Sequence, residues 1–345
     1  MHGHEQLLFH HEPEAGYAGI IAVHDTSLGP AMGGTRFWNY DAEEDAVADV
    51  LRLSRAMTYK AAMAGLEAGG GKAVIIGDNR RPDREALFRA HGRAVQSLGG
   101  RYITAEDVGT SADDMEFVRL ETDFVTGLYG RSGDPSPMTA LGTQQAIRAA
   151  ATEVYGDGNL DGLRVAVQGL GNVGMRLCDL LSQEGARLVV TDIDGARIER
   201  AVESFAAEAV DQEEIYSIEA DVFAPCALGG VIRDETLPLL KVDIVAGAAN
   251  NQLAEPRHGE ALRQRGILYA PDYVGNAGGL ISIYGELRGW ESSQALQKVR
   301  AIFETLKRVF EFARAQDIDP ATAADRMAEA CIREAREARI ARSRV

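Results

Sequence analysis

A short segment with three spaced glycines restricts the fold more than any other part of the chain. The run Gly169-Leu170-Gly171-Asn172-Val173-Gly174 directly follows an apolar strand that ends at Gln168, and it opens a helix. In such a run the first glycine permits a tight turn, the second lets the backbone approach a pyrophosphate, and the third lets the helix pack against the strand. The helix N-terminus adds unpaired N–H groups that attract phosphate. The pattern predicts a dinucleotide-binding βαβ unit.

An acidic residue stands at a suitable distance beyond these glycines. Asp192 ends a second apolar strand, 18 residues after Gly174, where a carboxylate would meet the ribose 2′-hydroxyl of adenosine. It would repel a 2′-phosphate, which favours NAD over NADP; FAD uses the same fingerprint, but usually near the N-terminus of its chain. The alternative without a ligand is that Asp192 caps a helix. The predicted cofactor loop and acid are Gly169, Leu170, Gly171, Asn172, Val173, Gly174, Met175 and Asp192.

Apolar strands alternate with helical segments in the second part of the chain. The predicted strands are 164–167, 187–190, 221–224, 243–246 and 267–269. This alternation indicates a parallel sheet covered on both faces. A chain of 345 residues is long enough for two domains. We therefore expect an α/β protein with a Rossmann-type doubly wound NAD-binding domain over residues 136–320, beginning with a helix over about 139–155.

The preceding region, residues 1–135, mixes strands and helices without strict alternation, which predicts a separate α/β domain. A C-terminal helix over about 320–345 is expected to pack back on it, and a cleft is expected between the two domains. The elements predicted within the first domain are a strand at 17–24, a helix at 41–60, a glycine-dense turn at 69–71, a strand at 73–76, a helix at 83–98 and a strand at 101–103.

Composition excludes several classes of protein. The chain has 52 acidic against 36 basic residues, a net charge of −16. That balance argues against binding to nucleic acid or to anionic membrane surfaces. Three widely separated cysteines indicate neither a disulfide scaffold nor a zinc cluster, and no metal site is predicted. Without a signal peptide or a long apolar stretch, a cytoplasmic location is expected.

Two lysines and an aspartate form the candidate catalytic group of the first domain. Lys60 is followed twelve residues later by Lys72, which comes directly after Gly69-Gly70-Gly71, and Asp107 follows the strand near residue 103. The glycines would let a substrate or a backbone segment approach closely. Burial and a neighbouring cation would lower a lysine's pKa from its usual value of about 10.4 into the range of a working base. The alternative is that both lysines lie on the surface.

These motifs resemble those of the glutamate/leucine/phenylalanine/valine dehydrogenases, and most closely those of the leucine branch. The resemblance runs from Gly29-Pro30-Ala31-Met32-Gly33-Gly34-Thr35-Arg36 through Gly69-Gly70-Gly71-Lys72 to Asn276-Ala277-Gly278-Gly279. It implies a reversible NAD-dependent oxidative deamination of an L-amino acid to a 2-oxo acid and ammonia. It also implies a homo-oligomer, an octamer or a dimer, assembled through the first domain.

The resemblance implies a role for each matching residue. Lys72 would activate water, Asp107 would handle the proton of the amino group, and Lys60 would bind the α-carboxylate. Further residues implied at the substrate or the nicotinamide are Gly33, Gly34, Asn276, Thr139 and Asn250.

Met32 bears on which amino acid is used. Glutamate-specific members carry a lysine at this place, and methionine cannot neutralise a side-chain carboxylate. With Ala105, Leu280 and Ile283, Met32 would line an apolar cavity for a branched aliphatic side chain. Because methionine is flexible, an aromatic amino acid (phenylalanine or tryptophan) stays open as the alternative substrate.

Two other functions compete with this one. A 2-hydroxy-acid dehydrogenase would need a histidine paired with an arginine, and His24, His91 and His258 stand in no such motif. A regulator that binds NAD without chemistry would be expected to have lost Lys60, Lys72 or Asp107, and all three are present.

Overall fold

The computed structural model describes residues 3–128 and 134–343. The chain forms two compact units. Unit 1 comprises Met1–Gly133, Glu286–Gly289 and Ala328–Val345, and unit 2 comprises Asp134–Gly285 and Trp290–Met327. The C-terminal helix expected over about 320–345 is present as α12 (Pro320–Ser343), whereas residues 344 and 345 lie outside the described residues.

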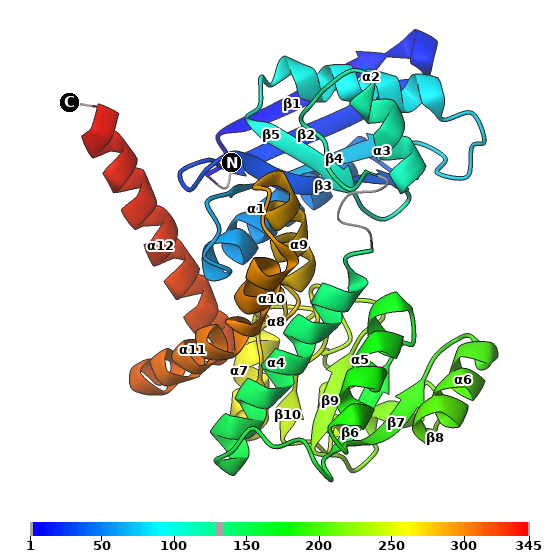
Figure 1. Cartoon of the computed structure of the whole chain (residues 1–345), viewed down its shortest axis with the longest axis vertical. Helices are drawn as coiled ribbons and strands as arrows, with labels where there is room; N and C mark the ends of the chain where they lie inside the picture. Colours follow the sequence, from blue (N-terminus) through cyan, green and yellow to red (C-terminus); the bar gives the residue numbers. More distant parts are fainter. Residues whose placement is uncertain (1–2, 129–133, 344–345) are drawn as a thin grey trace. The chain divides into compact units, whose positions relative to one another are not determined.

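Unit 1 is built on a five-stranded mixed sheet in the order β1-β2-β4-β3-β5 (Figure 1). β2 runs antiparallel to β1 and β4, and β3 runs parallel to β4 and β5. The strands are β1 (Gln6–Glu12), β2 (Tyr17–Asp25), β3 (Ala31–Trp38), β4 (Gly69–Ile76) and β5 (Tyr102–Glu106). The helices are α1 (Glu43–Met63), α2 (Glu85–Ser97) and α3 (Ala112–Arg119).

Helices cover this sheet on opposite sides, as Figure 1 shows for α1 and α2. Ala73 and Ile75 of β4 pack into one apolar core with α2 and α3. Val74, between them, packs with Ala46 and Val50 of α1. Because successive side chains of a strand point to opposite faces, these contacts define an α1 face and an α2 face of the sheet.

The glycines that precede Lys72 belong to a strand and not to a turn. β4 begins at Gly69, so the predicted glycine-dense turn at 69–71 is wrong. The strands β1 and β3 were also missed. Glycine has a low strand propensity, so the glycines of β3 and β4 weaken the strand signal in the sequence. In the structure both strands are stabilised by pairing with a neighbouring strand on each side.

Unit 2 contains a six-stranded, wholly parallel sheet in the order β11-β10-β9-β6-β7-β8. In chain order this is 6-5-4-1-2-3, the doubly wound Rossmann arrangement that was predicted. The strands are β6 (Arg164–Gln168), β7 (Arg187–Thr191), β8 (Glu208–Ala209), β9 (Val222–Pro225), β10 (Ile244–Val245) and β11 (Leu268–Tyr269). Only β8 was not predicted, because it consists of two exposed residues at the sheet edge.

The helices of unit 2 include α4, which was expected near 139–155 and begins slightly earlier. They are α4 (Ser136–Tyr155), α5 (Asn172–Gln183), α6 (Gly195–Phe205), α7 (Arg257–Gln264), α8 (Asp272–Gly275), α9 (Gly278–Leu287), α10 (Ser292–Arg300) and α11 (Ile302–Gln316). α9 and α12 each continue into residues of unit 1. Among the described residues, none of the helices is both long and apolar enough to cross a membrane.

Candidate active site

Three charged side chains of unit 1 meet at one carboxylate oxygen. Nζ of Lys72 lies 3.0 Å from Oδ2 of Asp107, and Nε of Arg36 lies 3.1 Å from the same oxygen. The Lys72 side chain is 6% exposed and that of Asp107 is 24% exposed. The cluster therefore joins a buried ammonium group to a carboxylate that solvent or a substrate can still reach.

Three neighbouring strands bring these groups together. Arg36 lies on β3, Lys72 lies on β4, and Asp107 is the first residue after β5. Lys72 alternates with Ala73 and Arg36 alternates with Phe37, and both of those apolar residues belong to the core on the α2 face. The charged cluster therefore stands on the α1 face of the sheet.

Burial and charge act against each other in this cluster. Burial lowers the pKa of Lys72 below its usual value, and the charge of Arg36 acts in the same direction, whereas Asp107 opposes them. Burial also disfavours the charged form of Asp107, but Lys72 and Arg36 together hold the pKa of this carboxyl below its usual value. The site thus keeps an ionised acid beside a lysine that gives up its proton more easily than a lysine in water.

Arg36 is the residue of this cluster to which the sequence assigned no role. Its Nη1 lies 2.7 Å from Oδ2 of Asp49, which also accepts a 2.8 Å hydrogen bond from Tyr40. The sequence suggested Lys60 as a neighbouring cation, and the structure adds Arg36, whose charge lowers the pKa of Lys72. Arg36 stands two residues after Gly34, a spacing that puts both on one face of a strand. This would have placed Arg36 beside the predicted substrate residues only if β3 had been recognised as a strand.

The predicted substrate residues of unit 1 lie on the same three strands and on α1. Lys60 is half-buried in the last turn of α1. Met32 is 3% exposed and Ala105 is 6% exposed. Gly34 lies opposite Ala105 in the register of β3 and β5, and Gly33 lies beside it. By strand alternation, Met32 and Ala105 share the α1 face with Lys72.

The glycines before Lys72 serve close packing. A Cβ at Gly70 would overlap the backbone nitrogen of Thr58, so this glycine lets α1 lie directly against β4. A Cβ at Gly71 would meet the ring of Tyr102 at 2.6 Å. The close approach foreseen for these glycines is therefore made by the protein's own backbone and by a buried ring.

In unit 2 the three glycines of the loop before α5 have three different environments. Gly169 has φ +98°, and a Cβ on Gly174 would overlap the carbonyl oxygen of Gly169. A Cβ on Gly171 would meet nothing within 4 Å. One glycine thus makes the turn, one allows the helix to pack, and the middle one leaves open space at the N-terminus of α5, an arrangement that fits a bound pyrophosphate.

Asp192 holds the glycine loop. Its carboxylate, 6% exposed, accepts hydrogen bonds from the backbone N–H of Leu170 at 2.6 Å and of Asp194 at 2.9 Å. The N-cap of α6 is Asp194, whose side chain accepts from the N–H of Ala196. The alternative in which Asp192 caps a helix is therefore wrong.

A second group of predicted residues gathers at the start of α9. Asn276 donates to Oδ1 of Asn250 at 2.8 Å and to the carbonyl of Ala248 at 3.1 Å. Its own Oδ1 is buried and, within the described part of the chain, has no hydrogen-bond partner. A Cβ on Gly279 would meet Oγ1 of Thr139 at 2.8 Å, so Thr139 of α4 lies against the same helix start.

Leu280 and Ile283 stand three residues apart on α9 and so share a helix face. Leu280 is buried, and Ile283 is partly exposed.

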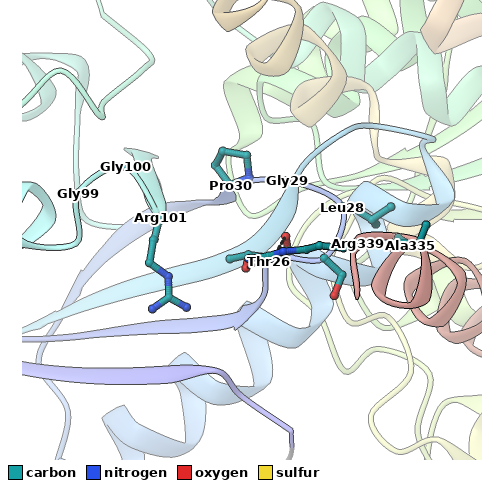
Figure 2. Close-up of a pocket in the computed structure, with 11 residues that line it drawn as sticks. Thr26, Leu28, Gly29, Pro30, Gly99, Gly100, Arg101, Ala335 and Arg339 are labelled. Atoms are coloured by element: carbon teal, nitrogen blue, oxygen red, sulfur yellow. Dashed lines mark hydrogen bonds between the residues drawn. The ribbon is translucent and has the colours of Figure 1, made fainter. Parts of the chain in front are cut away.

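A hollow elsewhere on unit 1 has no part in this site. Its volume is about 660 Å³, and Arg339 of α12 donates to the carbonyl of Thr26 at 3.1 Å beside it. Figure 2 shows the residues around this hollow. Its lining consists of Thr26, Ser27, Leu28, Gly29, Pro30, Gly99, Gly100, Arg101, Ala335, Ala338 and Arg339. None of the predicted site residues lines it. No cluster of metal-ligating side chains occurs within 3–128 or 134–343.

Comparison with known proteins places both parts of the chain in one family. The family model described as "Glu/Leu/Phe/Val dehydrogenase, dimerisation domain" matches residues 4–124, and the model described as "Glutamate/Leucine/Phenylalanine/Valine dehydrogenase" matches 130–201 and 194–339.

Individual relatives match over nearly their whole length. A leucine dehydrogenase of Geobacillus stearothermophilus is 54% identical over 97% of this chain and 92% of its own. An L-tryptophan dehydrogenase of Nostoc punctiforme is 49% identical over 95% of this chain and 93% of its own. The crystal structure of the L-tryptophan dehydrogenase from Nostoc punctiforme matches with a TM-score of 0.87 and 48% identity, covering 97% of each chain.

Proposed function

Because this chain belongs to the Glu/Leu/Phe/Val dehydrogenase family and is an amino-acid dehydrogenase, we propose that its substrates are L-leucine and, less specifically, valine and isoleucine, with NAD as the cofactor. The reaction converts the amino acid, NAD⁺ and water into the 2-oxo acid, ammonium, NADH and a proton, and it is reversible. The observation that carries the proposal is the buried Lys72 ammonium group at 3.0 Å from Asp107.

The residues of unit 1 divide the proton chemistry between them. Asp107 accepts a proton from the substrate ammonium group. Lys72 and Arg36 both contact its Oδ2, so among the described residues Oδ1 is the oxygen open to the substrate. The α-carboxylate pairs with Lys60. NAD, when bound, supplies the acceptor for the hydride that leaves Cα. Lys72, once neutral, takes a proton from the water that attacks the resulting imine carbon, which then releases ammonia.

Unit 2 supplies the residues for the cofactor. The N–H groups at the start of α5 and the open space at Gly171 suit a pyrophosphate, and Asp192 beside them suits the ribose hydroxyls of NAD. Thr139, Asn250 and Asn276 form a polar group whose buried Asn276 Oδ1 needs a donor, which the carboxamide of a nicotinamide would provide.

The apolar residues around the site support an aliphatic substrate. Met32 and Ala105 stand on the α1 face beside the charged cluster, and no charge on Met32 can balance a substrate side-chain carboxylate. Leu280 and Ile283 of α9 are proposed to complete the cavity wall. The similarity to an L-tryptophan dehydrogenase makes an aromatic L-amino acid the second candidate.

The match to a dimerisation domain supports an oligomer assembled through unit 1. We propose a homo-oligomer, an octamer or a dimer, which light scattering coupled to gel filtration would distinguish. We also propose a cytoplasmic location, which cell fractionation would test.

The proposed reaction is tested by following NADH at alkaline pH with a panel of substrates. We expect the highest kcat/KM with L-leucine, lower values with L-isoleucine and L-valine, and no NADH from L-lactate; NADP should replace NAD poorly. A higher kcat/KM with L-phenylalanine or L-tryptophan would establish the second candidate instead. Absence of NADH with every amino acid would overturn the proposal.

The role of Lys72 is tested by Lys72→Ala. Removing the base should lower kcat at least about 100-fold, the usual contribution of a positioned proton-transfer group, while the affinity for NADH stays unchanged. The matched control is Lys241→Ala, which removes an exposed lysine of unit 2 and should keep full activity. Near wild-type turnover in Lys72→Ala would place the proton chemistry elsewhere.

A further inference from the structure

A line of polar side chains crosses the apolar core on the α2 face, directly behind the strands that carry the candidate site. The surrounding core consists of residues such as Phe37, Phe88 and Val95. A buried polar network of this kind is costly unless every member is paired. Its members, all fully buried, are Tyr17, Thr35, His91, Tyr102 and Thr104.

Hydrogen bonds join these side chains end to end, and the one between Thr104 and Tyr102 is the longest. The Tyr17 hydroxyl lies 2.9 Å from Nδ1 of His91, whose Nε2 lies 2.7 Å from Oγ1 of Thr35. Thr35 lies 2.6 Å from the hydroxyl of Thr104, which lies 3.4 Å from the hydroxyl of Tyr102. The Tyr102 hydroxyl ends the line by donating to the carbonyl of Gly33 at 2.6 Å.

The Tyr17 hydroxyl decides which atom donates in each hydrogen bond on either side of His91. Burial lowers the pKa of His91 to about 3, so the ring is neutral and has one donor and one acceptor. If Tyr17 donates to Nδ1, then Nε2–H donates to Thr35 and Thr35 to Thr104. The Tyr102 hydroxyl has a single hydrogen, which can go to Thr104 at 3.4 Å or to the Gly33 carbonyl at 2.6 Å, and the shorter contact is the stronger bond. In the reverse arrangement the Tyr17 hydroxyl hydrogen would have no acceptor among the described residues. The first arrangement gives the Tyr17 hydrogen an acceptor and is therefore favoured.

The line ends where the sheet is interrupted. The register between β3 and β4 pairs Met32 with Gly70 and resumes only at Thr35 with Ala73. The Gly33 carbonyl in this gap is held by Tyr102. Since a peptide unit is planar, the bond to this carbonyl also sets the orientation of the Gly34 N–H.

Tyr102 also supports the strand that carries Lys72. Its ring lies where a Cβ of Gly71 would be, one residue before Lys72. Tyr102 thus contacts both β3 and β4 from the α2 face, behind the proposed substrate site on the α1 face.

We propose that Tyr102 is a positioning residue for substrate binding: its hydroxyl holds the Gly33–Gly34 peptide in place by donating to the Gly33 carbonyl, while Thr104, Thr35, His91 and Tyr17 continue the buried polar line away from the site. The inference rests on the proposed function, in which Gly33 and Gly34 contact the substrate. If the line only stabilised the core, removing any of its five polar groups would lower Tm and leave KM unchanged.

Tyr102→Phe tests this, because it removes the hydroxyl and keeps the ring against Gly71. We expect KM for L-leucine to rise roughly tenfold, the effect of leaving a buried carbonyl unpaired, with kcat and the affinity for NADH within about twofold of wild type. Tyr17→Phe is the matched control: it removes an equally buried hydroxyl at the far end of the line. Both variants should lose a similar few degrees of Tm, and KM in Tyr17→Phe should change by less than about twofold.

Equal KM changes in the two variants, or a wild-type KM in Tyr102→Phe, would overturn the positioning role. If Tyr102→Phe fails to fold, Tyr102→Met, which also removes the hydroxyl and keeps a long apolar side chain near Gly71, should show a raised KM with unchanged kcat, and an unchanged KM there would count equally against it. Wild-type enzyme that forms no NADH with any amino acid would instead contradict the proposed function, so the two failures can be told apart.

Discussion

Arg36 contacts two carboxylates, with Asp107 at 3.1 Å and Asp49 at 2.7 Å. Burial disfavours its charged form, but these two carboxylates raise its pKa above the usual value, so the guanidinium stays charged. A permanent positive charge beside Lys72 makes protonation of that lysine less favourable. At the scale of single residues, Arg36 therefore adds to the effect of burial in lowering the pKa of Lys72, the proposed base, against the opposing charge of Asp107.

The sign of this effect can be measured with Arg36→Gln. Removing the cation should raise the pKa of Lys72, and since the neutral lysine is the active form in the proposed mechanism, the rising limb of log kcat/KM should move to higher pH. Arg52→Gln is the control, because Arg52 pairs with Asp49 at 2.8 Å and makes no contact with Asp107 among the described residues. A limb that stays in place in Arg36→Gln, or moves in Arg52→Gln, would contradict this account.

At the scale of elements, two glycines of the loop between β6 and α5 have different roles. One is required for packing, and the other borders the space proposed for the pyrophosphate. Gly171 is the N-cap of α5 and has φ −67°, a conformation that alanine adopts without strain. Gly174 packs against the carbonyl of Gly169, which leaves no room for a side chain.

Alanine at these two positions should therefore have different effects. Gly171→Ala should fold with the Tm of the wild type and bind NADH at least about tenfold more weakly, because its methyl group occupies the space proposed for the pyrophosphate. Gly174→Ala should lower Tm, since the new Cβ overlaps backbone. Fluorescence titration with NADH and thermal unfolding measure the two properties. Equal losses of affinity and of Tm in both variants would show that the middle glycine serves packing as well.

At the scale of the whole molecule, the end of the chain contributes to the unit in which the chain begins. Arg336 of α12 forms an ion pair with Asp25 at the end of β2, and Glu329 accepts a 2.7 Å hydrogen bond from Tyr59. Asp25 is 2% exposed, so its carboxylate needs this partner. Unit 1 is therefore completed only when residues more than 300 positions apart meet.

Arg336→Ala should lower the free energy of unfolding by about 1–3 kcal/mol, because it leaves a buried carboxylate without its cation. Arg333→Ala, an exposed position one turn earlier on the same helix, should change it by less than about 0.5 kcal/mol. Denaturant unfolding of both variants would measure the difference. Similar values for the two would mean that the tail contributes little to unit 1.

The parallel sheet of unit 2 was predictable because its signals are local. Apolar strands, the glycine loop and Asp192 follow each other at short spacing along the chain, and the right-handedness of βαβ connections leaves few arrangements of such strands. The strands of unit 1 were harder to predict, since β3 and β4 contain glycines that weaken the local signal and are stabilised by neighbours distant in the chain.

The amino-acid sequence alone determined the Rossmann sheet and, through resemblance, the choice of Lys72 and Asp107. Only the tertiary structure decided that Arg36 joins them and that Tyr102 holds Gly33 from behind. The physical reason is that these contacts depend on strand order: β3 lies between β4 and β5, so residues 36, 72 and 107 become neighbours through pairing that no local pattern encodes.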